Sequence, residues 1–264
     1  MVKLKKLKKT LKFSLRVVKY KLHRWFNFDE KKKYDYKRIK AYKNLHKNKR
    51  CFIIGTGPSL TIEDLEKLKD ETCFASNSIV KCFDKTTWRP VYYGITDDFV
   101  YAECEEQILK ADLPNVFLFN RIDAPHFSIP NNFEIPNRFI VLPEIRRDGF
   151  GNNVYSMVYN NATITGSLIQ IAKYMGFKDV YLLGCDCNYV GKNRHFHDAQ
   201  YAPKGDGADY VSRNYKHYNA FINAKKYADA NKINIFNATR GGRLDMFPRV
   251  ALDKVLNNGD DYNE

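Results

Sequence analysis

Several features that would place this chain outside a cell or across a membrane are absent from its sequence. No uninterrupted apolar run approaches the roughly 18 residues that span a bilayer, and the N-terminus lacks the apolar centre of a signal peptide. The six cysteines include no Cys-x-x-Cys pair, and several lie within apolar runs. We therefore expect buried free thiols in a reducing compartment and a cytoplasmic protein.

Acidic residues are scarce at the start of the chain. Residues 1–50 hold 20 of the 44 Lys and Arg but only three of the 30 Asp and Glu, a net charge of +17. The rest of the chain carries 24 basic and 27 acidic residues, a net charge of −3, so the formal charge of +14 comes from the N-terminal fifth. This asymmetry predicts an anionic partner for the N-terminal segment and not for the remainder.

Residues 1–28 combine this charge with a narrow apolar stripe. Apolar side chains recur at spacings of three and four, at Leu4, Leu7, Leu11, Leu15, Val18, Leu22 and Trp25. The pattern predicts an amphipathic helix on an anionic membrane surface, where each basic residue contributes about 1 kcal/mol. A helix docked on a partner protein and a nucleic-acid arm are the alternatives, and we expect no nucleic acid because such an arm needs no leucine stripe. Residues 29–49 are expected to be a charged linker or a second short helix.

From residue 50 onward, short apolar runs alternate with helical patterns. Strands are expected at residues 51–55, 72–76, 91–95, 115–119, 138–142, 179–184 and 233–239. Helices are expected at residues 61–70, 97–111, 163–176 and 213–231. This alternation predicts one α/β domain over residues 50–264, with a mostly parallel sheet covered by helices on both faces.

The first expected strand ends in Gly-Thr-Gly-Pro-Ser. Gly55 and Gly57 remove side chains from the turn, so that backbone N–H groups can approach a phosphate or ribose. Pro58 suits the first turn of the following helix, and Ser59 or Thr61 can cap it. A tight turn without a ligand is the alternative, because the sequence is neither a complete Gly-x-Gly-x-x-Gly fingerprint nor a Walker loop.

Polar residues follow the other expected strands as well. Asn77 follows the second strand, Asp97 and Asp98 follow the third, and Asp186 ends the strand at 179–184. Hydroxyls and a glycine open the helix at 163–176, at Thr163, Thr165, Gly166 and Ser167. Helix capping by one of the aspartates and a simple turn at Asp186 are the alternatives. Because ligands bind at the carboxyl ends of strands in such sheets, the convergence predicts a nucleotide pocket.

These motifs resemble those of the bacterial sialyltransferases of glycosyltransferase family 42. The residues that carry the resemblance are GTGPSL after the first strand, SN after the second, TITGS at the start of a helix and GFKDVYLLGCD. It covers roughly residues 50–250. The same skeleton occurs in a wider group that contains MptE-like 6-hydroxymethylpterin diphosphokinases and Maf flagellin-modification proteins. The ending NATRGG-LDMFPRV is similar to that of cell-envelope polysaccharide proteins in this group.

The resemblance implies a modified Rossmann-like domain that transfers a nonulosonic (sialic-acid-like) sugar from a CMP donor with inversion and without an obligatory metal or cofactor. By position, it implies donor contacts at Gly55, Thr56, Gly57, Ser59, Asn77, Thr165, Gly166, Ser167, Asp186, Tyr189 and Tyr201. Thr56 stands where the family has asparagine, and Asp97 appears where another asparagine is expected. The second departure favours an alternative, a magnesium-dependent diphosphokinase that uses ATP.

Inverting sugar transfer needs a base for the proton of the acceptor hydroxyl, and histidine is the usual choice. The resemblance favours His217, which lies near the place of the family's catalytic histidine, with His195 and His197 as alternatives. Residues 187–212 are polar and long enough to form a lid over the donor. Zinc binding by Cys185, Cys187, His195 and His197 is a weaker alternative, because the spacing fits no standard finger.

We therefore expect a glycosyltransferase of cell-envelope polysaccharide (capsule) synthesis, held at the inner face of the cell membrane. Its expected partners are the nucleotide-sugar donor, a glycan or lipid-linked acceptor and the anionic membrane. The alternatives are the diphosphokinase and a non-catalytic nucleotide-binding scaffold. The sequence leaves homo-oligomer formation open.

Overall fold

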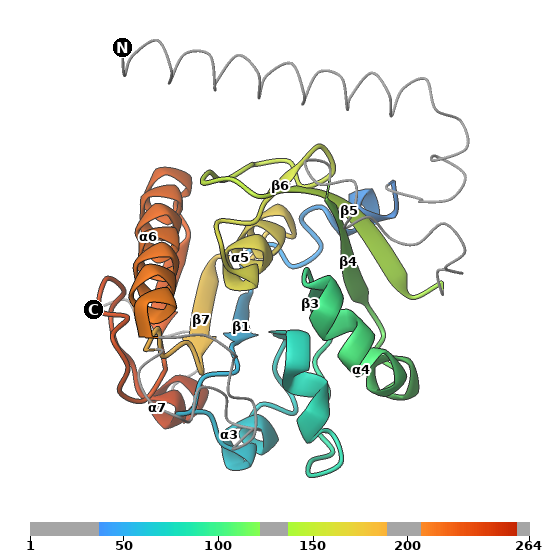
Figure 1. The fold of residues 1–264 in the computed structure, drawn as a ribbon, viewed down its shortest axis with the longest axis horizontal. Coiled ribbons are helices and arrows are strands. Elements are labelled where there is room, and N and C mark those ends of the chain that lie inside the picture. The colour runs from blue at the N-terminus through green and yellow to red at the C-terminus, as the bar shows by residue number, and fades with distance from the viewer. Residues whose placement is uncertain (1–36, 122–136, 189–206, 258–264) are drawn as a thin grey trace.

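The computed structural model describes residues 37–121, 137–188 and 207–257 of the chain. These residues include eight strands, at Arg50–Ile54 (β1), Cys73–Ser76 (β2), Tyr92–Ile95 (β3), Val116–Arg121 (β4), Phe139–Ile145 (β5), Val158–Tyr159 (β6), Asp179–Leu183 (β7) and Asn234–Asn237 (β8). They form one sheet in the order β6-β5-β4-β3-β2-β1-β7-β8, and every neighbouring pair is parallel (Figure 1). The predicted parallel α/β architecture is confirmed.

Helices cover both faces of this sheet. The α-helices are Ile62–Lys67 (α3), Asp98–Lys110 (α4), Ile164–Tyr174 (α5), Gly207–Asn231 (α6) and Leu252–Asn257 (α7), and two 3₁₀-helices are Arg38–Tyr42 (η1) and Asn77–Cys82 (η2). Helices α5 and α6 pack on one face, whereas α3, η2, α4 and α7 pack on the other (Figure 1).

Side-chain alternation along each strand produces the two cores. In β1, Cys51 and Ile53 point toward α5 and α6, while Phe52 and Ile54 point toward α3 and α4, and all four are fully buried. A strand that is apolar on both sides fits only a sheet covered on both faces, which is why these runs read as continuous apolar segments. All six cysteines are buried and unpaired, as predicted.

The strand order reverses direction between β1 and β7. Strands β1 to β6 follow one another toward one edge, and α5 then returns the chain to β7, on the other side of β1. The connection after β1 runs through α3 on one face, and the connection after β7 runs through α6 on the other. Such a reversal opens a crevice at the carboxyl ends of the two strands, where open α/β sheets bind ligands.

The segment that precedes β1 packs on this domain from residue 37 onward. Ile39 of η1 is fully buried in the core beneath α5. The ring of His46 stacks on Phe177 and lies 2.7 Å from the hydroxyl of Tyr92. Residues 37–49, expected to be a linker or a short helix, thus form η1 and a turn on the sheet. Residues 1–36, which include the expected amphipathic helix, lie outside the described residues.

Two local expectations need correction. Pro58 lies in a turn before α3 and not in its first helical turn, because Thr61 starts the helix through a capping box with Asp64. The last residues of the expected lid, 207–212, belong to α6, which begins at Gly207, earlier than the sequence pattern indicated.

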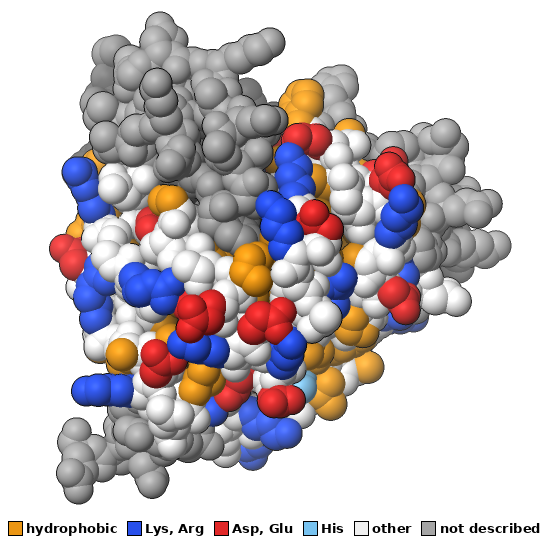
Figure 2. Space-filling view, turned by 90° about the horizontal axis from the view of Figure 1, so that it is seen from below, with side chains coloured by type: hydrophobic (Ala, Val, Ile, Leu, Met, Phe, Trp, Pro, Cys, Tyr) orange, Lys and Arg blue, Asp and Glu red, His pale blue; other side chains and the backbone are white. Residues whose placement is uncertain are grey.

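Charges of both signs are interspersed on the lower face of the molecule (Figure 2). Charged side chains also pair between elements, as Lys67 does with Asp253 and Lys81 with Glu103. Mixed charge of this kind agrees with the nearly neutral composition of the chain after residue 50. Among the described residues, no helix is both long and apolar enough to cross a bilayer.

Candidate active site

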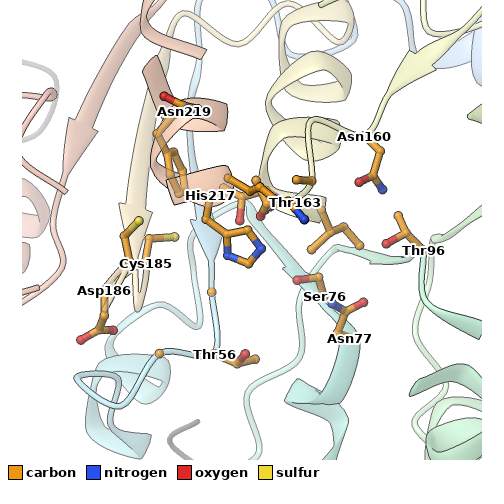
Figure 3. A pocket seen from close by; sticks show the side chains of 18 of the residues that line it. Thr56, Ser76, Asn77, Thr96, Asn160, Thr163, Cys185, Asp186, His217 and Asn219 are labelled. Carbon is orange, nitrogen blue, oxygen red and sulfur yellow. Dashed lines mark hydrogen bonds between the residues drawn. The ribbon is translucent and has the colours of Figure 1, made fainter. Parts of the chain in front are cut away.

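A cavity of about 950 Å³ opens at the carboxyl edge of the sheet, a volume typical of small-molecule sites. Hydroxyls, amides, carboxylates, cations and one imidazole line it. Figure 3 shows the imidazole and several of the hydroxyls and amides. Residues from the expected site that line it are Gly55, Thr56, Gly57, Asn77, Asp97, Thr165, Asp186 and His217. Further lining side chains that the sequence analysis did not select as site residues include Ser76, Thr96, Arg146, Arg147, Asn160, Asn188, Tyr215 and Lys216.

The two glycines after β1 use their own N–H groups for contacts within the protein. The N–H of Gly55 bonds to Leu183 O and that of Gly57 bonds to Gly184 O, both at 2.8 Å, so neither N–H points to a ligand. A Cβ on Gly57 would lie 2.6 Å from Gly184 O, closer than real side chains come to a backbone oxygen. Glycine is required here because the loops after β1 and β7 pack against each other.

Asp186 lies at the edge of the cavity, held by the same loop contact. Its Oδ2 accepts a hydrogen bond of 2.9 Å from the hydroxyl of Ser59. Burial raises the pKa of the Asp186 carboxyl, and the bond from Ser59 opposes that rise. Ser59 itself does not line the cavity, so the structure places it behind Asp186 and not at the expected donor contact.

Asn77 has a backbone and a side chain that both favour a binding role. Its φ of 49° lies in the left-handed region, which non-glycine residues adopt rarely and mostly at special sites. The hydroxyl of Tyr93 donates to the Asn77 carbonyl at 2.5 Å and holds this conformation. Among the described residues, the buried Oδ1 atoms of Asn77 and Asn188 have no hydrogen-bond partner, and both residues line the cavity. A ligand with N–H or O–H groups would satisfy them.

Only some of the residues expected to contact the donor at the start of α5 line the cavity. Thr163 caps the helix by accepting from the N–H of Thr165, and both threonines line the cavity. Gly166 and Ser167 do not line it. Ser167 is fully buried and donates to Glu144 at 3.4 Å, so its expected phosphate contact is wrong in this structure.

Two adjacent arginines, Arg146 and Arg147, bring positive charge to the cavity on the loop after β5. Two fully buried amides hold the loop that continues from them. Asn161 accepts from the N–H of Gly149 at 2.7 Å, and Gln170 accepts from the N–H groups of Gly151 and Tyr159 at 3.1 Å each. The same rule about strand ends that selected Asn77 would have selected this pair.

Helix α6 supplies the other wall of the cavity. Tyr215, Lys216, His217 and Asn219 all line it, and Figure 3 shows the imidazole of His217 between Asp186 and Thr163. The expected residues Tyr189, His195, His197 and Tyr201 lie outside the described residues.

Asp97 caps α4, as one of the two alternatives from the sequence proposed; the other was a contact with the ligand. Its Oδ1 accepts from the N–H groups of Phe99 and Val100, and the residue also lines the cavity. Within the described ranges, no cluster of three or more His, Cys, Asp or Glu has the arrangement to hold a metal ion. Burial raises the pKa of Cys185 to about 12 and that of Cys187 to about 11, so both are thiols at neutral pH.

Arg240 lies outside the cavity lining. Its guanidinium forms hydrogen bonds of 2.7 and 2.5 Å with the two carboxylate oxygens of Asp64 and one of 2.9 Å with Ser59 O. Burial alone would raise the pKa of Asp64, but the bonds from Arg240 and Thr61 lower it overall. Arg240 therefore joins the loop after β8 to the start of α3.

Comparisons with known proteins agree with this architecture. The family model described as 6-hydroxymethylpterin diphosphokinase MptE-like matches residues 26–192. No curated protein matches the chain. The solved structure of the MAf glycosyltransferase from Magnetospirillum magneticum AMB-1 is similar, with a TM-score of 0.53 and 16% identity. The similarity covers 81% of this chain but only 35% of that one, so it shows a shared fold with about a third of a longer protein.

Proposed function

The chain belongs to the MptE-like family, and from that premise we propose that it is a transferase that binds a nucleotide-activated donor in the cavity. One observation carries the proposal. Two arginines, the hydroxyl-rich start of α5 and an imidazole line the same cavity, and the first two are groups that commonly bind phosphate. Arginine recognises phosphate through paired hydrogen bonds, and a helix start favours negative charge.

We further propose that the reaction is glycosyl transfer, with a CMP-linked nonulosonic acid as the donor. Similarity of fold to a glycosyltransferase and the resemblance of the GTGPSL and TITGS motifs support this choice. The cavity volume of about 950 Å³ suits a donor of this size. The acceptor would be a hydroxyl of a cell-envelope glycan.

In this mechanism, the acceptor oxygen attacks the anomeric carbon while His217 takes the hydroxyl proton. The bond between that carbon and the phosphate oxygen breaks, and CMP leaves with the electron pair. Arg146, Arg147 and the start of α5 stabilise the negative charge that develops on the phosphate. Attack from the face opposite the leaving group inverts the configuration, and no metal is needed for the charge balance.

A second candidate is phosphotransfer of the MptE type, in which the protein transfers diphosphate from ATP with magnesium. The family match favours it, as does Asp97 beside Thr96 in the cavity. Asp97 already caps α4 through Oδ1, so only Oδ2 is left for a metal. A non-catalytic nucleotide-binding scaffold is the third reading.

Three measurements distinguish the three functions. Melting temperatures with CMP, CDP, UDP, GDP and ATP, each with and without magnesium, identify the nucleotide, because a ligand that binds only the folded state raises the melting temperature. Release of CMP from CMP-N-acetylneuraminate in the presence of glycan acceptors then tests glycosyl transfer. AMP formation from ATP that EDTA abolishes would instead establish diphosphate transfer, and binding without either product would leave the scaffold.

We also propose that the protein acts at the inner face of the cell membrane. The net charge of +17 in residues 1–50 and the leucine stripe within residues 1–28 support this location. Confinement at the surface raises the effective concentration of a lipid-linked acceptor without any new contact in the cavity.

A further inference from the structure

Glu144 is a fully buried carboxylate at the end of β5, behind the cavity wall. Its Oε1 accepts hydrogen bonds from Asn160 Nδ2 at 2.9 Å and from the hydroxyl of Ser167 at 3.4 Å. Burying a carboxylate is costly, and the mechanism above does not use Glu144. Its contact with Asn160, which is 5% exposed and lines the cavity, indicates a function.

The contact orients the side chain of Asn160. In the structure the NH₂ group of Asn160 faces Glu144 and donates to Oε1, and an ionised carboxylate in this place can only accept, which keeps the Oδ1 atom facing away. In the described part of the chain, the bond to Glu144 is the one hydrogen bond of the Asn160 side chain. Asn160 therefore presents its Oδ1 atom, a hydrogen-bond acceptor, to the cavity. The bond to Glu144 prevents the amide from turning to present its NH₂ group instead.

The position of Asn160 indicates which part of the ligand it meets. Asn160 follows β6, on the β5 side of the sheet, whereas His217 lies on α6 beyond β7. In Figure 3, Asn160 and Thr96 lie on one side of the site, Asp186 lies on the other, and Thr163 lies between. If the reacting bond lies at His217 and the phosphate at the start of α5, as in the proposed function on which this step rests, the nucleoside extends toward Asn160.

We propose that Glu144 and Asn160 make the cavity select nucleobases that carry an amino group at C4 of a pyrimidine or at C6 of a purine. The amino group of cytosine or adenine donates to Asn160 Oδ1. Uracil and hypoxanthine place a carbonyl oxygen at the same position, and two oxygens without a proton between them repel each other. Asn160 meets the ligand, and Glu144 is a positioning residue that acts through it.

Binding of matched nucleotides to the full-length protein tests this inference without any turnover. We expect CMP to bind about ten-fold more tightly than UMP, and AMP more tightly than IMP, by isothermal calorimetry. In Asn160→Ala, the ratio of the UMP and CMP dissociation constants should fall to about one. Glu144→Leu removes the acceptor for Asn160 Nδ2, frees the amide to turn, and should lower the ratio in the same way.

Two conservative variants separate the role of the carboxylate from that of its neighbours. Ser167→Ala leaves the Glu144–Asn160 bond in place and should keep the preference for CMP, whereas Glu144→Gln supplies a donor as well as an acceptor, no longer fixes the amide of Asn160, and should lower the preference. A merely structural role would weaken the binding of CMP and UMP equally and leave their ratio unchanged. If Glu144→Leu does not fold, Asn160→Ala decides the question.

Equal binding of CMP and UMP by the natural protein, or a preserved preference in Asn160→Ala, would overturn the inference. This failure is distinguishable from that of the proposed function. If the protein transfers no sugar but prefers CMP through Asn160, the proposed function fails and the base-selecting contact stands. If it transfers sugar but binds CMP and UMP equally, the base-selecting contact fails and the proposed function stands.

Discussion

The carboxyl group of Asp186 lies directly against Cα of Gly57. A side chain at position 57 would place its Cβ 2.8 Å from Asp186 Cγ. The contact joins the loops after β1 and β7 at the point where the strand order reverses. Both residues line the cavity of the proposed donor site.

Gly57→Ala should therefore destabilise the fold. The added methyl group meets backbone oxygen as well as the carboxylate, and overpacking of this kind costs about 1–3 kcal/mol. Chemical denaturation would measure the loss. Gly166→Ala is the matched control, because its Cβ would lie 3.4 Å from the nearest atom and alanine favours a helix by about 0.5–1 kcal/mol. Equal stability of the Gly57→Ala and natural proteins would contradict the close packing.

Asp186→Asn should change the dependence of stability on pH. Burial raises the pKa of Asp186 in the folded protein above its ordinary value of 3.8. The raised pKa means that folding favours the protonated form, so this group stabilises the fold below pH 3.8 and loses that contribution as the pH rises through the raised value. The amide variant has no such loss and keeps an oxygen for Ser59. Denaturation at a series of pH values should show Asp186→Asn gaining stability relative to the natural protein with rising pH, and a gap that stays constant would refute this.

Arg240→Gln should destabilise the fold by about 1–2 kcal/mol near neutral pH, because it leaves the buried carboxylate of Asp64 with fewer partners. The bonds from Arg240 and Thr61 hold the pKa of Asp64 below 3.8. The stabilisation is therefore present above pH 3.8 and is lost as the pH falls through the lowered value. Lys67→Gln, which breaks the more exposed pair with Asp253, is the control and should cost less than about 1 kcal/mol. A similar loss in both variants at neutral pH would show that burial of Asp64 does not matter.

His217→Ala should lower kcat about a hundred- to ten-thousand-fold while the donor still binds, because the variant removes the base and leaves the arginines and α5 in place. Lys226→Ala, on the exposed side of the same helix, is the matched control and should retain full turnover. Single-turnover kinetics together with calorimetry separate binding from chemistry. Unchanged turnover in His217→Ala would move the base to His195 or His197.

Deletion of residues 1–28 should abolish binding to anionic vesicles and spare catalysis on a soluble acceptor. A second variant, with Leu4, Leu7 and Leu11 changed to serine, keeps every charge and removes part of the stripe. It should also bind vesicles more weakly, since an interfacial helix needs buried apolar area as well as charge. Sedimentation with vesicles of phosphatidylserine and phosphatidylcholine is the measurement. Full binding by the truncated protein would refute the interfacial helix.

Most of the fold was predictable because apolar runs and amphipathic segments are local patterns. Seven of the eight strands in the described ranges were expected from the sequence, and β6, with only two residues, is too short to form such a pattern. The shared cavity followed from the rule about strand ends, which brought Asn77, Asp97, Thr165 and Asp186 to one edge. The rule does not say where a side chain points, so Ser59 and Ser167 were placed in the cavity although one lies behind Asp186 and the other faces Glu144.

The sequence by itself determined the parallel α/β architecture, the buried thiols and the separation of a basic leader from a nearly neutral domain, because periodicity and composition are properties of the chain. Only the tertiary structure decided what each polar group does. The glycines after β1 make room for the loop after β7, Arg240 binds Asp64, and Asn160 donates a hydrogen bond to Glu144. Each of these contacts joins different elements of the fold, and the direction of a hydrogen bond between them depends on a packing that no local pattern encodes.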